Sequence, residues 1–361
     1  MTKIMKTLFV SIASLSLLIS TAQAGELTVS GTAKATYLTV SGAQDDNGIG
    51  ITNELNFTAS GEMDNGYAWS YSTELDPTTT GDTAASPSNT PPGGALNDDT
   101  QIAITMNDMG TVKICVSECG NGKEYAADQS VYTSMTDTGF SEGMTYPGSS
   151  ASYASIQYHT PELPYGTTAS IAWGQKKVDG QGANTTGQDT GAGNGANGNS
   201  IEEYSLVTKP IDGVTLSAQY YDINDYDDGL TNETQLEEGG SYAIEYATGN
   251  LSLGWGKSFK APETTAAVTA GATTVEYYEN TLMSVAYAVN DALSVSYTRE
   301  EGERNFQTSS TVAYDIETDS IQIAYSLGGA TLSIARADYE NVGYANGVDA
   351  QDTIVAMTFA F

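Results

Sequence analysis

The connections between the strand-like segments of this chain alternate between short and long, and this regularity restricts the folds open to it. The short ones are turns rich in Gly, Asn and Asp, such as Asn65 and Gly66, a pair that favours a tight hairpin. The seven short turns lie at residues 64–66, 107–110, 161–166, 210–213, 248–250, 290–291 and 328–329. The eight longer stretches lie at about residues 41–50, 76–99, 118–150, 178–200, 223–238, 260–273, 300–312 and 340–350. Seven short and eight long connections predict sixteen strands.

The segments between these connections alternate in polarity. One face carries Leu, Val, Ile, Tyr or Trp, as in Leu253 with Trp255 and Val295 with Tyr297, and the other carries Ser, Thr, Gln and Gly. A soluble sandwich would alternate in the same way, but it has no reason to keep all its short turns at one end. Segments of about 9 to 11 residues are long enough to cross a bilayer at a tilt. The sequence therefore predicts an antiparallel transmembrane β-barrel, with short turns at one end and long loops at the other.

The last residues of the chain form a stripe suited to lipid on one side and to water or close packing on the other. In an extended chain every second side chain points to the same side. The odd-numbered residues here are mainly apolar: Thr353, Val355, Met357, Phe359 and Phe361. The opposite side carries residues that are mostly small or polar: Asp352, Ile354, Ala356, Thr358 and Ala360. No stretch after residue 25 approaches the roughly 20 apolar residues of a membrane helix. A membrane crossing by this chain therefore requires a closed barrel.

The beginning of the chain predicts a cleaved signal peptide over residues 1–24. Lys3 and Lys6 precede an apolar run, and Ala22 and Ala24 provide small residues before a cleavage at Gly25. The mature domain would then span residues 25–361. Removing the two lysines leaves 11 basic against 45 acidic residues, a formal charge of −34. Nucleic acid and anionic lipid surfaces are poor partners for such a chain.

Catalytic motifs are absent from the sequence. It contains no Gly-x-Ser-x-Gly elbow, no HExxH pair and no phosphate-binding glycine loop. His159 is the single histidine, and no residue stands out as a nucleophile beside it. We therefore expect the protein not to be an enzyme.

Several motifs, in order and spacing, resemble the general porins of Gram-negative outer membranes, nearest the alphaproteobacterial type. They are the signal peptide, the opening Gly-Glu-Leu-Thr-Val-Ser-Gly at Gly25, the hairpin from Gly61 to Gly66, the strand from Gly110 to Ile114 before a long loop, and the terminal Phe361. The resemblance covers the whole mature chain. It implies a homotrimer of sixteen-stranded barrels in the cell outer membrane, in contact with lipid and lipopolysaccharide, each with a water-filled pore for small hydrophilic solutes. The short turns would then be periplasmic and the long loops extracellular. It also implies that the barrel assembly machinery recognises Phe361.

The resemblance further implies that the third long loop, residues 118–150, folds inward and narrows the pore, with acidic residues facing basic ones on the wall. The acidic candidates on this loop are Glu118, Glu124, Asp128, Asp137 and Glu142. Polar-face parity points three basic residues into the lumen: Lys34, Lys113 and Lys176. The loop lacks the enterobacterial signature Pro-Glu-Phe-Gly-Gly-Asp.

The basic side of the predicted constriction is thin. Arg299, Arg304 and Arg336 fall at or near predicted loop ends rather than in the middle of strands. A mainly acidic lining raises the local concentration of cations, so we expect the pore to prefer them.

Cys115 and Cys119 stand where the fifth strand enters the third long loop. Thiols in an oxidising compartment tend to pair. On a continuous strand their α-carbons would lie about 13 Å apart, too far for a disulfide, so pairing requires the chain to turn between them. A disulfide that closes the loop is favoured, and two separate thiols are the alternative.

One acidic loop could bind Ca²⁺, since carboxylates supply the oxygen ligands this ion prefers. Its aspartates are Asp222, Asp225, Asp227 and Asp228. The loop lacks the ligand spacing of an EF-hand, and a solvated acidic loop is the alternative. No other cofactor or metal site is expected.

Two other functions remain open from the sequence. A substrate-specific channel for a sugar or small nutrient could use an aromatic track in the third loop, formed by Tyr125, Tyr132 and Tyr146. A secreted, acidic, β-rich surface or adhesion protein would have no pore. Such a surface protein would not need the alternation of turn lengths or the terminal Phe361.

Overall fold

The computed structural model describes residues 26–42, 46–75, 98–116, 119–134, 140, 142–152, 154–175, 200–224, 235–264, 274–308 and 312–361. The predicted signal peptide lies outside this range. No helix in the described part of the chain is long and apolar enough to cross a membrane.

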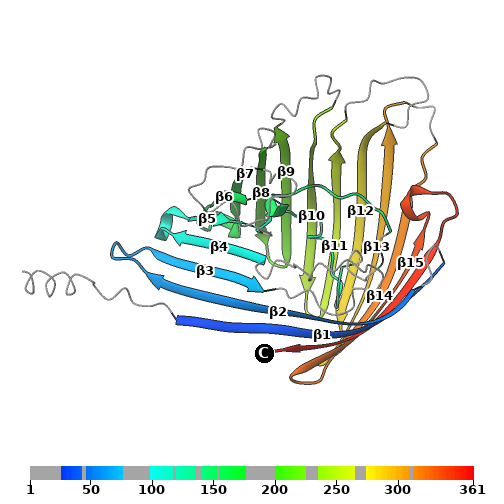
Figure 1. The fold of residues 1–361 in the computed structure, drawn as a ribbon, viewed down its shortest axis with the longest axis horizontal. Coiled ribbons are helices and arrows are strands. Elements are labelled where there is room, and N and C mark those ends of the chain that lie inside the picture. Colours follow the sequence, from blue (N-terminus) through cyan, green and yellow to red (C-terminus); the bar gives the residue numbers. More distant parts are fainter. Residues whose placement is uncertain are drawn as a thin grey trace, which may run out of the picture.

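Sixteen strands among the described residues form one closed antiparallel barrel, as the alternation of connections predicts. Each strand pairs with its neighbours in sequence, and β16 pairs with β1 to close the wall. Figure 1 shows this wall in sequence order, with the C-terminus beside β1. The strands are β1 (Glu26–Gly42), β2 (Asp46–Glu62), β3 (Ala68–Leu75), β4 (Asp98–Thr105), β5 (Thr111–Cys115), β6 (Ala154–His159), β7 (Thr168–Gln175), β8 (Ser200–Ile211), β9 (Val214–Asn224), β10 (Glu238–Thr248), β11 (Leu251–Ala261), β12 (Val275–Ala288), β13 (Leu293–Phe306), β14 (Ile316–Ser326), β15 (Ala330–Glu340) and β16 (Ala350–Ala360).

The C-terminal residue completes the closure of the barrel. The backbone N–H of Phe361 donates to the carbonyl of Gly31 in β1 at 3.0 Å, and the N–H of Gly31 donates to the carbonyl of Phe361 at 2.8 Å. The Phe361 side chain is 66% exposed, and Phe359 on the same face is also exposed. Asp352 on the opposite face is buried. The terminal strand therefore has the two faces that its sequence predicts.

The wall as a whole is apolar outside and polar inside. In β14, Ile321 and Ile323 are 60% and 41% exposed, whereas Ser320 and Gln322, which alternate with them, are buried. The buried residues of this wall are mostly small or polar side chains on the inner face, and the outer face exposes many large apolar and aromatic side chains. This is the reverse of a soluble protein, and it is the distribution that a hydrocarbon surrounding requires.

All seven predicted short turns lie between consecutive strands and at one end of the barrel. Two of them need their glycine. Gly213, between β8 and β9, has φ 76°, and a Cβ there would lie 2.5 Å from the carbonyl oxygen of Ala247. Gly110, between β4 and β5, has φ 88°, and a Cβ there would lie 2.3 Å from the carbonyl oxygen of His159 on β6. Gly66, between β2 and β3, also has a positive φ of 82°, but a Cβ there would meet nothing within 4 Å.

Two of the expected long connections are shorter than predicted. In the stretch 41–50, all the described residues, 41–42 and 46–50, belong to strands, because Val40 pairs with Asp46 and Thr39 with Asn47. In the stretch 300–312, β13 continues to Phe306. Strand lengths also depart from the expected range, from 5 residues in β5 to 17 in β1 and in β2. Polar composition misled the prediction here, because ladder hydrogen bonds can continue beyond the apolar band, where side chains need not be apolar.

We expect Gly110→Ala to lower the free energy of unfolding by about 3 kcal/mol, because it combines an unfavourable φ with a backbone clash. The matched variant Gly66→Ala has the unfavourable φ without the backbone clash, so its free energy of unfolding should fall by only about 1 kcal/mol. Urea unfolding of the barrel in detergent micelles measures both. Equal losses in the two variants would contradict the tight packing of Gly110 against β6.

Candidate functional site

The loop segment between β5 and β6 runs along the inner wall of the barrel. The clearest anchor is Gln322, an inward-facing residue of β14. Its Oε1 accepts the backbone N–H of Tyr132 at 3.0 Å and of Thr133 at 3.1 Å, and its Nε2 donates to the Thr133 carbonyl at 2.7 Å. One side chain thus satisfies three backbone groups of a loop segment that has no strand partner, which holds this part of the loop against β14.

Short polar side chains of other strands anchor the loop in the same way. The N–H of Val131 donates to Ser296 Oγ of β13, and the N–H of Gln129 donates to Ser284 Oγ of β12, both at 3.0 Å. On β9, Gln219 Nε2 donates to the carbonyl of Gly148 at 3.0 Å. These bonds join the loop to β9, β12, β13 and β14 across the inner surface. The described part of the loop therefore lies along the inner wall, and its narrowing of the pore stays a prediction.

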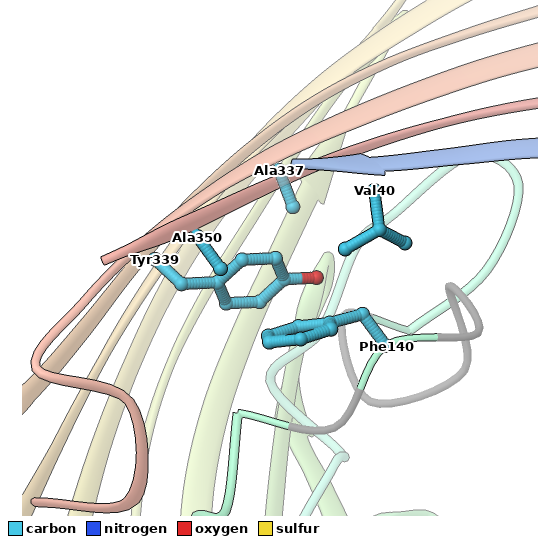
Figure 2. Packing of buried hydrophobic residues seen from close by; sticks show 5 residues of the cluster. All are labelled: Val40, Phe140, Ala337, Tyr339 and Ala350. Atoms are coloured by element: carbon cyan, nitrogen blue, oxygen red, sulfur yellow. The ribbon is translucent and has the colours of Figure 1, made fainter. Parts of the chain in front are cut away.

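An aromatic contact holds the loop against the strands that follow β14 around the barrel. Phe140 packs on Tyr339 of β15, with ring centroids 5.0 Å apart, and lies in a buried cluster with Val40 of β1. Figure 2 shows the Phe140 ring against Tyr339, with Ala337 and Ala350 on the wall behind them. The loop thus contacts both sides of the β1–β16 seam.

Close approach of the loop to the wall requires a residue without a side chain at Gly254 of β11. A Cβ at this position would lie 1.8 Å from the carbonyl oxygen of Ala127 in the loop. Any larger residue would displace the loop from the wall.

Three carboxylates of the wall hold the loop or the strands beside it. Tyr146 of the loop donates its hydroxyl proton to Glu300 Oε2 of β13 at 3.0 Å. The N–H of Ser150 donates to Glu203 Oε2 of β8 at 2.8 Å. Asp352 of β16 accepts the hydroxyl of Tyr339 at 3.0 Å. The sequence prediction missed these acids, although an acidic residue in the middle of a strand and on its polar face was a signal for each of them.

Three of the predicted loop acids lie on the described part of the inner loop, and two do not. Glu142 is buried, and this burial raises the pKa of its carboxyl group. Repulsion from Asp352 raises the same pKa to a smaller extent. Burial also raises the pKa of Glu124 and of Asp128. Asp128 accepts the N–H of Ser130 at 2.9 Å, so it stabilises the loop's own turn. The remaining two acids, Glu118 and Asp137, lie outside the described residues.

The predicted basic residues of the wall face inward where they are described. Lys34 of β1 places its Nζ 5.8 Å from the ring centroid of Tyr132. Lys113 of β5 alternates with the exposed Ile114 and points to the lumen, within electrostatic range of His159. Lys176 lies outside the described residues.

Two arginines differ from the sequence prediction, which placed them near loop ends. Arg299 lies within β13 and Arg336 within β15, and both face outward. Arg299 pairs with Glu317 and Asp319 on β14. Arg336 pairs with a carboxylate of its own strand, Asp338, at 3.4 Å. Strand parity decides this placement, because each arginine shares a face with exposed apolar residues of its own strand. The outward arginines add no positive charge to the lumen wall.

The inner surface carries further charges that the sequence prediction did not single out. Glu54 of β2 is exposed and accepts the hydroxyl of Thr32 at 3.3 Å. Lys123 belongs to the loop itself, and its Nζ donates to the carbonyl of Gly122 at 3.2 Å. Lys260 of β11 pairs with Glu237 at 2.9 Å.

The two cysteines lie at the end of β5 and at the start of the loop. Cys115 is buried and Cys119 is partly exposed. The carbonyl of Cys119 accepts Nε2 of Gln157 on β6 at 2.6 Å, which holds the start of the loop against the wall. The disulfide between Cys115 and Cys119 stays a prediction.

The calcium site also stays a prediction. Asp222 lies on the outer face of β9, opposite Glu202 of β8 and Glu238 of β10 in the strand register. The other three predicted ligands, Asp225, Asp227 and Asp228, lie outside the described residues. Within the described ranges, no group of three or more His, Cys, Asp or Glu residues is arranged to hold a metal ion.

We expect Gln322→Leu to release the loop locally, because three backbone groups of the loop lose their partner. Each lost hydrogen bond costs about 1 kcal/mol, so amide hydrogen exchange in a peptide spanning residues 130–134 should become at least about tenfold faster. The control Gln351→Leu changes the same residue type on the outer face and should leave this exchange unchanged. Equal exchange in both variants would rule out Gln322 as an anchor of the loop.

No protein-family model matches the chain, and no curated protein matches its sequence. Solved structures match over almost its whole length. A porin refined at 1.8 Å resolution is 15% identical, and the match covers 93% of this chain and 100% of that porin with a TM-score of 0.62. OmpF of Salmonella typhi, in complex with daunomycin, is 12% identical over 94% of this chain and 98% of its own, with a TM-score of 0.64.

An anion-selective porin from Comamonas acidovorans also matches. It is 12% identical over 93% of this chain and 100% of its own, with a TM-score of 0.58. These matches show that the chain has the sixteen-stranded barrel fold of the general porins, as the sequence predicts. The alphaproteobacterial type stays a prediction.

Proposed function

We propose that this chain is an outer-membrane porin, a water-filled channel for the passive diffusion of small hydrophilic solutes and ions. The observation that carries the proposal is a closed barrel whose outer face is apolar and whose polar inner face binds a loop along the lumen. An apolar exterior needs lipid around it, and a polar interior suits water. A non-pore surface protein would bury its apolar face between sheets instead. The proposal requires no catalytic step.

The charges of the inner wall support a preference for cations. The acids that face inward among the described residues include Glu54, Glu124, Asp128, Glu142, Glu203, Glu237, Glu245 and Asp352. The inward bases include Lys34, Lys113, Lys123, Lys260 and Arg304. Arg299, Arg336 and Lys257 lie on the outer face of the wall, where each pairs with a carboxylate. An excess of carboxylates in the lumen raises the local concentration of cations. One structural neighbour is an anion-selective porin, so the fold does not set the ion preference and the charges of the individual chain must do so.

In planar bilayers we expect stepwise conductance and, across a KCl gradient, a reversal potential of the sign given by K⁺ permeation. Glu54→Gln should lower the K⁺-to-Cl⁻ permeability ratio, because it removes an exposed charge from the lumen. Glu317→Gln makes the same charge change on the outer face and should leave the ratio unchanged. A reversal potential of the anionic sign would contradict the cation preference, and the absence of conductance would contradict the porin function itself.

A diffusion porin is favoured over a sugar-specific channel by the contacts of the loop tyrosines. Tyr125 and Tyr146 pack on each other with ring centroids 5.0 Å apart, and Tyr146 also bonds to Glu300. Tyr132 lies under Lys34. These rings therefore have structural contacts in place of the free faces that an aromatic track offers to a sugar. Block of the current by a particular sugar, in the bilayer experiment above, would support the specific channel instead.

The proposal includes the location and assembly that the family resemblance implies. The chain would be exported by its cleaved signal peptide, inserted into the outer membrane of a Gram-negative bacterium by the barrel assembly machinery, and would form a homotrimer in contact with lipopolysaccharide. The exposed ring of Phe361 at the end of β16 supports a role as the assembly signal, because its backbone already closes the barrel while its side chain stays accessible.

Deletion of Phe361 should therefore reduce the yield of inserted barrel several-fold while leaving the conductance of each inserted channel close to that of the wild type. The ring lies on the outer face, away from the lumen, and only the pair of backbone bonds to Gly31 is lost. Outer-membrane fractionation measures the yield, and single-channel recording measures the conductance. Normal yield from the shortened chain would rule out the assembly role.

A further inference from the structure

Arg304 near the end of β13 is held by aromatic rings on the inner side of the barrel. Strand parity turns it inward, because Arg304 alternates with the outward-facing residues of β13, and Tyr278 of β12 lies opposite it in the register. Its guanidinium carbon lies 5.0 Å from the ring centroid of Phe306 and 4.7 Å from that of Tyr344. Tyr344 in turn contacts Tyr278, with ring centroids 5.7 Å apart. These contacts fix the plane of the guanidinium group.

The charge of Arg304 is not matched by a carboxylate in the described part of the chain. Lys257, Lys260, Arg299 and Arg336 each have a carboxylate oxygen within 3.4 Å. Arg304 is in none of the ion pairs among the described residues, its Nε is buried with no hydrogen-bond partner, and its Nη2 reaches only the Tyr344 carbonyl, at 3.5 Å. A guanidinium group presents five N–H donors, so this one retains donors for a ligand.

Arg304 also lies beside the loop between β5 and β6. Gly302, the preceding inward residue of β13, faces Met144 of the loop, which a Cβ at Gly302 would approach to 3.1 Å. The segment that carries Tyr344 bonds to the same loop, because the N–H of Gly343 donates to the carbonyl of Glu142 at 2.8 Å. A solute that enters from the end with long connections would meet Arg304 before it passes Glu300 and Tyr146.

We propose, resting on the porin function above, that Arg304 is a binding subsite for the carboxylate or phosphate group of an anionic solute at the outer mouth of the pore. A planar guanidinium fork matches both groups by two parallel hydrogen bonds, which an ammonium group does not reproduce. In an acidic lumen that favours cations, this subsite lets a solute with one anionic group enter. The anionic group gives up its bound water and accepts two hydrogen bonds from the guanidinium group of Arg304 instead.

The subsite is tested with the full-length protein in planar bilayers, with inorganic phosphate or succinate added on the side of the long connections. For the wild type we expect block of the current that saturates with either anion. Arg304→Gln should raise the half-blocking concentration about tenfold, the usual effect of losing a hydrogen bond to a charged group. Arg304→Lys keeps the positive charge but loses the paired N–H donors of the guanidinium group, so it should also bind the anion more weakly. This variant separates the effect of the paired hydrogen bonds from that of the charge alone. Arg336→Gln is the control, because it removes the same charge from the outer face. Its current should be blocked at the same anion concentration as that of the wild type.

Equal block in Arg304→Gln and in the wild type would overturn the subsite while leaving the porin function intact. Equal weakening by Arg336→Gln would also overturn it, because the effect would then come from net charge. A folded protein that conducts no current would instead contradict the porin function. In that case, calorimetric titration of phosphate into the detergent-solubilised protein decides the subsite: binding lost in Arg304→Gln supports it, and unchanged or undetectable binding in the wild type and the variant overturns it.

Discussion

The closed ladder of backbone hydrogen bonds is the constraint on which the rest of this structure depends. A sheet that meets hydrocarbon cannot leave an edge, because an unpaired N–H or C=O would have no water to bond with. The pairing of β16 with β1, completed by the bonds between Phe361 and Gly31, removes that edge. Once the ladder is closed, the two-residue period of a strand assigns every side chain to the lipid or to the lumen.

The interior is organised by polar side chains that bond to a loop. In a soluble protein the inner face of a sheet buries apolar residues, but here Gln219, Ser284, Ser296 and Gln322 face inward and supply partners for loop backbone groups. The loop is thereby held without a strand of its own. The outer face of the same wall carries its own ion pairs, because Lys257, Arg299 and Arg336 face outward and pair with outward carboxylates. Arg304 is an inward cation that is held by aromatic rings and has no ion pair among the described residues.

Much of the fold could be predicted because turns and alternation are local properties. An Asn-Gly pair such as Asn65 and Gly66 specifies a hairpin from two residues, and the stripe ending at Phe361 is visible from parity alone. The predictions are wrong where a loop is inferred from polar composition although the backbone pairs as a strand. Residues 46–50 look like a loop because they are polar, yet they continue the ladder of β2 with β1. Arg299 and Arg336 were placed near loop ends because the strand bounds were uncertain by a few residues.

The sequence by itself determined the number of strands, the end of the barrel at which the short turns lie and, on most strands, which residues face lipid, because each follows from spacing along the chain. Only the tertiary structure decided which inner residues meet the loop. Gly254 approaches Ala127 across more than a hundred residues of sequence, and the carboxylates of Glu203 and Glu300 meet Ser150 and Tyr146 only once the barrel has closed. Contacts across the lumen depend on the curvature of the whole wall, and no local pattern encodes that curvature.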